Sequence, residues 1–120
     1  MGYSELTTVL IEVMQEQLET YKELLDIGNK KTDVLVNGDI KALNDITQQE
    51  QNLIIKLGKL EDERFALVGE IAKLFGKDAS QLKGDFFKSI LDDNSSQKFA
   101  KIYDELKEVL LEIQEQNDRN

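Results

Sequence analysis

One apolar stripe of strict helical spacing constrains the fold of this chain more than any other feature. It runs from Leu43 to Leu74 in steps of three and four residues, which place side chains on one face of an α-helix. Its members are Leu43, Ile46, Glu50, Leu53, Leu57, Leu60, Arg64, Leu67, Ile71 and Leu74. Because the sequence has no proline, nothing forces a break, and the spacing predicts a helix from about Ile40 to Phe75, roughly 50 Å long at about 1.5 Å per residue.

A second long helix precedes this one. Ser4 is expected to cap it, and helical spacing continues to about Val36. Asn37-Gly38 then predicts a turn, with Asp39 as the cap of the next helix. Two adjacent stripes run along the first helix, so its apolar face is wide enough to contact two other helices. One stripe consists of Ile11, Met14, Leu18, Tyr21, Leu25, Gly28, Thr32 and Leu35, and the other of Leu6, Leu10, Val13, Gln17, Thr20, Leu24 and Ile27.

The helical period is interrupted over residues 76–97, which begin with a glycine of the kind that ends helices. Within this stretch the spacing predicts one short helix near Phe86–Leu91. Ser95 or Ser96 is expected to cap a third long helix. That helix reaches Asn120 without a stop signal, so we expect it to continue beyond this sequence. Its stripe consists of Phe99, Ile102, Leu106, Val109, Ile113 and Gln116, with Tyr103 and Leu110 beside it.

Short connections between helices of similar length predict an all-α fold, an antiparallel bundle of three long coiled-coil-like helices with a short extra helix in the second connection. Phe86 and Phe87 are expected to close one end of this bundle, because exposing them costs about 25 cal/mol per Å² of apolar area. A chain of 120 residues is long enough for one modest core. We therefore expect residues 1–120 to form a single domain.

The composition excludes several kinds of chemistry. The sequence has no cysteine and no histidine, which excludes disulfides, the usual zinc sites, a Ser-His triad and a cysteine nucleophile. Its 24 acidic and 15 basic residues give a net charge of −9, which disfavours binding to nucleic acid or anionic membranes. No apolar run approaches the roughly 18 residues of a membrane-spanning helix. We expect a cytoplasmic protein that has no cofactor and is not an enzyme.

Two charged residues occupy positions that the stripe assigns to the core. Glu50 and Arg64 lie fourteen residues apart, about 21 Å along a helix, so they cannot pair with each other. A polar group at a core position stabilises one alignment of neighbouring helices relative to shifted alignments. We therefore interpret both residues as structural ones that fix the register. An active site is disfavoured, because Glu50 has no matched acid, base or metal partner in the pattern.

The same residues contribute to a resemblance to the FlgN-type flagellar export chaperones. Gly38-Asp39 open a helix in which Leu43 and Glu50 precede a leucine-rich run that ends in Glu61-x-x-Arg64, which looks like the helical hairpin of that family. Other residues that fit the family's pattern are Tyr21, Leu24, Leu25, Lys31, Leu57, Leu60, Asn117 and Asn120. The family usually continues past the second asparagine into an amphipathic segment, whereas this sequence ends there.

The resemblance implies a cytoplasmic chaperone that binds hook–filament junction (hook-associated) proteins and delivers them to the flagellar type III export apparatus. It would cover an aggregation-prone helical terminus of the client and would not hydrolyse ATP. Such a function needs an exposed apolar groove that recognises an amphipathic helix by anchors at i, i+3, i+4 and i+7. The candidate client-binding residues lie on the third long helix and are Tyr103, Leu106, Leu110, Ile113, Asn117 and Asn120.

Two alternatives stay open. In the first, five of the candidate residues pack inside the core of the bundle, namely Tyr103, Leu106, Leu110, Ile113 and Asn117. The protein could also be a structural bundle adaptor that self-associates and has no export role. The oligomeric state separates the two functions, because an adaptor forms a tight oligomer by itself, whereas a chaperone with an open groove is a monomer or a weak homo-oligomer.

Overall fold

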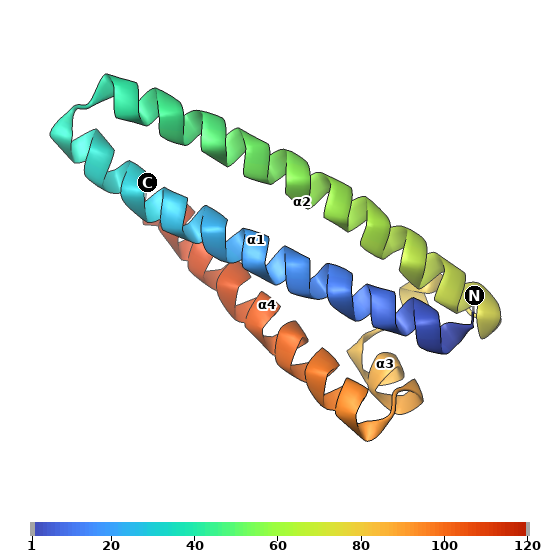
Figure 1. The fold of residues 1–120 in the computed structure, drawn as a ribbon. Helices are drawn as coiled ribbons and strands as arrows, with labels where there is room; N and C mark the ends of the chain where they lie inside the picture. The colour runs from blue at the N-terminus through green and yellow to red at the C-terminus, as the bar shows by residue number, and fades with distance from the viewer. Residues whose placement is uncertain (1, 120) are drawn as a thin grey trace.

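The computed structural model describes residues 2–119, which form helices and the segments that connect them. In chain order these are α1 (Tyr3–Asn37), α2 (Ile40–Leu74), the 3-10 turn η1 (Ala79–Gln81), α3 (Gly84–Ile90) and α4 (Asp93–Arg119). Helix α2 runs antiparallel to α1, and α4 runs antiparallel to α2 (Figure 1). The prediction of an all-α antiparallel bundle with a short helix in the second connection is confirmed.

The hairpin between α1 and α2 is closed by the predicted turn residues. Gly38 has φ +69°, a left-handed conformation that favours glycine, and its N–H donates a hydrogen bond to the Leu35 carbonyl. The Asp39 carboxylate then accepts a hydrogen bond from the Ala42 N–H at 3.0 Å, so Asp39 caps α2 as predicted. Gly76, with φ +63°, follows the end of α2 in the same way.

The other two predicted N-caps are wrong. Ser4 lies inside the first turn of α1, which begins one residue earlier. Helix α4 begins at Asp93, ahead of Ser95 and Ser96, because Asp92 takes the capping position and its carboxylate accepts the Ser95 N–H at 2.7 Å. This hydrogen bond holds the pKa of Asp92 below its usual value.

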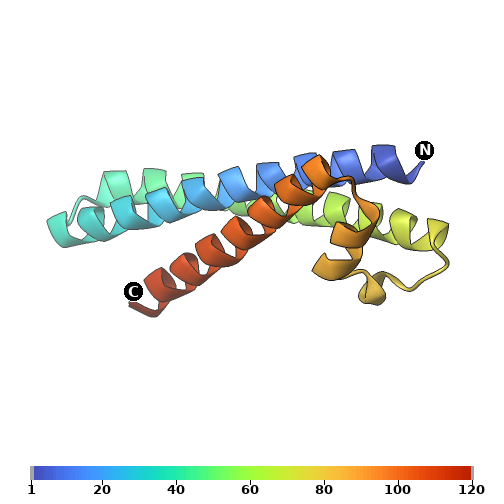
Figure 2. The same ribbon diagram turned by 90° about the horizontal axis from the view of Figure 1, so that it is seen from below.

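Helix α1 packs along both other long helices, whereas α2 and α4 do not pack along each other. The two predicted stripes of α1 account for this arrangement. Gln17 of one stripe donates a hydrogen bond to Glu61 of α2, and Leu25 of the other stripe accepts one from Gln116 of α4. Figure 2 shows α4 crossing the α1–α2 hairpin at an angle. The wide apolar face of α1 therefore holds two helices that diverge from each other.

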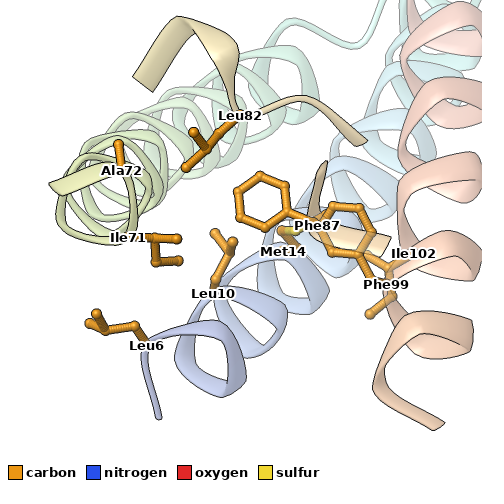
Figure 3. Packing of buried hydrophobic residues seen from close by; sticks show 9 residues of the cluster. All are labelled: Leu6, Leu10, Met14, Ile71, Ala72, Leu82, Phe87, Phe99 and Ile102. Carbon is orange, nitrogen blue, oxygen red and sulfur yellow. The ribbon is translucent and has the colours of Figure 1, made fainter. Parts of the chain in front are cut away.

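The main core lies at the end of the molecule where α1 begins and α2 ends. Its buried members come from four helices and the second connection (Figure 3), and they are Leu6, Leu10, Met14, Ile71, Ala72, Leu82, Phe87, Phe99 and Ile102. A series of ring contacts, with centroids between 5.2 and 5.9 Å apart, joins Tyr3, Phe75, Phe86, Phe87, Phe99 and Tyr103 in that order. Phe86 and Phe87 close this end of the bundle, as predicted.

The far end of α4 is attached to α1 by one glutamine. The side chain of Gln116 is only 7% exposed, and its amide donates hydrogen bonds to the Leu25 carbonyl at 3.1 Å and to the Asn29 side chain at 2.8 Å. This close approach is possible because Gly28 has no side chain, since a Cβ at that position would overlap the Gln116 amide. Gly28 and Gln116 therefore fix where α4 meets α1.

We predict that Gly28→Ala and Gly58→Ala have different effects on stability. Gly58 lies on α2, where an added Cβ meets nothing within 4 Å, so alanine is expected to raise the free energy of unfolding by about 0.5–1 kcal/mol through helix propensity. Gly28→Ala displaces the Gln116 amide and breaks its hydrogen bonds, which leaves this variant about 1–2 kcal/mol less stable than Gly58→Ala. Urea unfolding followed by circular dichroism measures both. Equal effects would contradict the proposed role of Gly28.

Candidate functional site

A groove of about 700 Å³ lies between α2 and α4, with α1 as its floor and the second connection at one end. It exists because α2 and α4 both pack on α1 and not along each other. Most of its lining is apolar. The apolar and aromatic residues of the lining are Leu10, Met14, Tyr21, Phe65, Val68, Ala79, Leu82, Phe87, Phe99, Tyr103, Leu106 and Leu110.

The floor of the groove is one face of α1, formed by Leu10, Met14, Gln17 and Tyr21. These residues follow each other at intervals of four, three and four, so they lie in line along the helix. From the first to the last they span about 16 Å at about 1.5 Å per residue, which corresponds to roughly three turns of a helix. The groove is therefore long enough to hold about three turns of a second helix.

The α2 wall combines exposed apolar surface with one ion pair. Phe65 lines the groove and is 70% exposed, an unusual position for a phenylalanine on a helix that packs against another helix. Below it, the Arg64 guanidinium donates two hydrogen bonds to the Glu61 carboxylate, and the buried Gln17 amide donates a third at 3.0 Å. The Gln17 bond connects this wall to the floor on α1.

The charges of this ion pair act on neighbouring titratable groups. The hydrogen bond from Arg64 holds the pKa of Glu61 below its usual value, and the bond from Gln17 adds to this effect. Burial in the groove floor raises the pKa of the Tyr21 hydroxyl, and the negative charge of Glu61 raises it further. Both shifts favour the same state at neutral pH, in which Glu61 is ionised and Tyr21 is neutral.

The α4 wall is formed by Tyr103, Leu106, Lys107 and Leu110, which share one face of the helix. The Lys107 ammonium lies 4.5 Å from the centroid of the Tyr103 ring, a cation–π distance. Leu110, at the end of this face, is 45% exposed. The α4 wall thus presents apolar side chains to the groove and a positive charge at its border.

The structure brings together half of the six candidate residues predicted from the sequence. Tyr103, Leu106 and Leu110 line the groove. Ile113 is half-buried and Asn117 is exposed, and neither contributes to the lining. Asn120 lies outside the described residues. The alternative in which the candidate residues all pack inside the core is wrong, because Leu110 and Asn117 are exposed.

Phe65 and Val68, which form the apolar part of the opposite wall, were not predicted from the sequence. The signal that could have found Phe65 is its position one residue after Arg64, off the stripe that packs against α1. A large aromatic residue at such a position is a candidate for a contact with another molecule when it lies beside other exposed apolar side chains.

Glu50 and Arg64 form separate ion pairs, and not with each other, as expected from their spacing. The Glu50 carboxylate accepts a hydrogen bond from the Lys31 ammonium of α1 at 3.1 Å, and both side chains are partly buried. Arg64 pairs with Glu61 on its own helix. Glu50 thus lies at the contact between α1 and α2 (the α1–α2 seam). Arg64, besides pairing with Glu61, lines the groove.

Residues 2–119 offer neither a metal site nor a membrane-spanning helix. In this part of the chain no cluster of three or more histidine, cysteine, aspartate or glutamate side chains is arranged to hold a metal ion. None of the helices between these residues has the length and apolar character needed to cross a membrane. The groove is therefore the candidate functional site of residues 2–119.

An elongated helical body with an open apolar groove is typical of proteins that bind an amphipathic helix of another polypeptide. The model of the family described as FlgN protein matches residues 1–120, and the chain belongs to the FlgN family. It is a flagellar export chaperone for hook-associated proteins and not an enzyme, and FlgN chaperones are cytoplasmic. No curated protein and no solved structure matches the chain. The predicted family and the predicted function are confirmed.

We predict that the contribution of Glu61 to stability depends on pH. Its folded-state pKa lies below the usual value of 4.5, so the stabilisation is complete above that value and is lost as the pH falls through the folded pKa. Comparison of the protein with a Glu61→Gln variant by urea unfolding at several pH values measures this contribution. The difference in free energy of unfolding should be constant near neutral pH and shrink below about pH 4.5. A difference that does not change with pH would contradict this assignment.

Proposed function

We propose that the groove between α2 and α4 is the site where this chaperone holds a helical terminus of a hook-associated protein. The observation that carries the proposal is the pair of exposed apolar side chains on opposite walls, Phe65 on α2 and Leu110 on α4. Apolar anchors on one face of a client helix would fill the space between them, as in other helix-in-groove complexes. The three-turn length of the floor fits a short amphipathic helix.

Export requires that a client be released as well as bound, and an open groove suits both steps. The apolar surface of the client is covered only on one side, so the complex buries a limited area and can dissociate. The acidic body of the chaperone keeps it dispersed in spite of its exposed apolar side chains. We further propose that the loaded chaperone delivers the client to the flagellar export apparatus.

The role that we propose for Glu50 is structural, because its carboxylate pairs with Lys31 across the α1–α2 seam and is not part of the groove. Partly exposed ion pairs of this kind contribute about 1 kcal/mol or less. Glu50→Ala is therefore expected to lower the free energy of unfolding by up to about that amount and to leave client affinity unchanged. A large loss of affinity without a change in the unfolding transition would contradict the structural role.

We predict that Phe65→Glu and Leu110→Glu each weaken binding of the client's terminal helix at least tenfold, which corresponds to about 1.4 kcal/mol. Both side chains are exposed in the free protein, so the helical content measured by circular dichroism should stay unchanged. Calorimetric titration with a peptide of the terminal helix measures the affinity. Leu111→Glu is the matched control, because Leu111 is 60% exposed on the same helix but does not line the groove. Equal losses in Leu110→Glu and Leu111→Glu would contradict the proposed site.

The family match does not support a structural adaptor without an export role, but the exposed walls of the groove make self-association of the chaperone a property to test. A chaperone with an empty groove is expected to sediment as a monomer or a weak dimer at micromolar concentration. Sedimentation velocity over a range of concentrations measures this. A tight oligomer in the absence of client would mean that a second copy covers the walls, and would contradict an open client groove.

A further inference from the structure

The charges that border the groove are opposite in sign to the charge of the protein as a whole. The chain carries a net charge of −9, yet its groove is lined by three cationic side chains, Arg64, Lys83 and Lys107, and by one carboxylate, that of Glu61. The charged residues of the lining are therefore mostly basic, whereas the charged residues of the whole chain are mostly acidic.

The cationic side chains differ in whether they have a partner. Arg64 is neutralised by its ion pair with Glu61 on the α2 wall. Within residues 2–119, the lysines that form ion pairs are Lys22, Lys31 and Lys56, so Lys83 and Lys107 are not among them. Two positive charges at the groove are thus available to a ligand.

Both of these charges lie near Tyr103 of α4, Lys107 on the same helix and Lys83 in the second connection, directly before α3. The Lys107 ammonium lies 4.5 Å from the centroid of the Tyr103 ring. Gly84, which follows Lys83, packs against the same ring, since a Cβ at Gly84 would lie 3.6 Å from it. The Tyr103 ring therefore lies beside Lys107 and beside the backbone that follows Lys83, whereas the α2 wall carries only the internally neutralised pair.

We propose that the groove recognises an amphipathic client helix whose apolar face is bordered along one edge by carboxylates, which pair with Lys83 and Lys107. This inference rests on the proposed function of the groove and adds the charge pattern of its ligand. The apolar face of the helix covers the groove, so its edge carboxylates meet these ammonium groups next to a surface from which water has been removed. Ion pairs there are stronger than ion pairs between fully exposed side chains.

The asymmetry of the walls also sets how the client helix is turned about its own axis. Its acidic edge faces α4, because only this wall offers unpaired positive charge. Its other edge faces the Glu61–Arg64 pair, which attracts neither sign strongly. The lysines thus select one rotational orientation and one charge pattern, while the apolar lining provides the contact area.

The test uses three helical peptides with the same apolar face and with glutamate, glutamine or lysine along one edge. Their affinities for the full chain are measured by fluorescence anisotropy at low and at high salt. The glutamate peptide is expected to bind best, by roughly two- to fivefold per ion pair over the glutamine peptide, and to lose this advantage at high salt. In the double variant Lys83→Glu, Lys107→Glu, the lysine peptide should bind best. Lys101→Glu, an exposed site on α4 that does not line the groove, is the matched control and should keep the original order.

Each other outcome overturns a different claim. Equal affinities for the three peptides would show that the groove takes an apolar helix without regard to charge, which ends this inference and leaves the proposed function intact. If none of the peptides binds although a hook-associated client does, the groove is not the client site and both claims fail. If the chain alone forms a dimer that the lysine variants disrupt, a second copy is the occupant and the proposed client pattern is wrong.

Discussion

The structure depends on the packing of one helix against two partners that do not pack against each other. Helix α1 carries two adjacent apolar stripes and packs along both α2 and α4. A regular three-helix bundle would bring α2 and α4 into contact and bury the surface between them. Here that surface stays open and becomes the groove, so the groove follows from how many apolar faces each helix has.

The groove keeps its shape because α4 is attached to α1 at both ends. At one end, Phe99 and Ile102 of α4 are buried in the main core together with Leu6, Leu10 and Met14 of α1. At the other end, the Gln116 amide lies against Gly28 and is hydrogen-bonded to α1. A site that is formed before the ligand arrives loses less conformational entropy on binding than one that the ligand must order. If the client lies in this groove, as we propose, its binding needs little rearrangement of the helices.

Much of this fold could be predicted from the sequence, but the groove could not. The unbroken stripe and the Asp39 cap placed α2 within one residue of its observed ends, because helical spacing and turn chemistry are local properties. The start of α4 was placed wrongly because Asp92 and the two following serines are all good caps, and only the backbone geometry selects one of them. The groove depends on which helices diverge. The spacing placed Leu110 beside the stripe of the third helix. It did not indicate Phe65 on the opposite wall, because Phe65 lies outside the apolar stripe of α2.

The central claim is that the client helix lies between α2 and α4, and nuclear magnetic resonance tests it most directly. The protein would be titrated with the terminal helix of a hook-associated protein while the signals of each residue are followed. We expect the largest changes at Phe65, Tyr103 and Leu110, and small changes at Ile55 and Leu111, which are exposed on the same helices but outside the groove. Changes confined to the α1–α2 turn, or equal changes inside and outside the groove, would contradict the account.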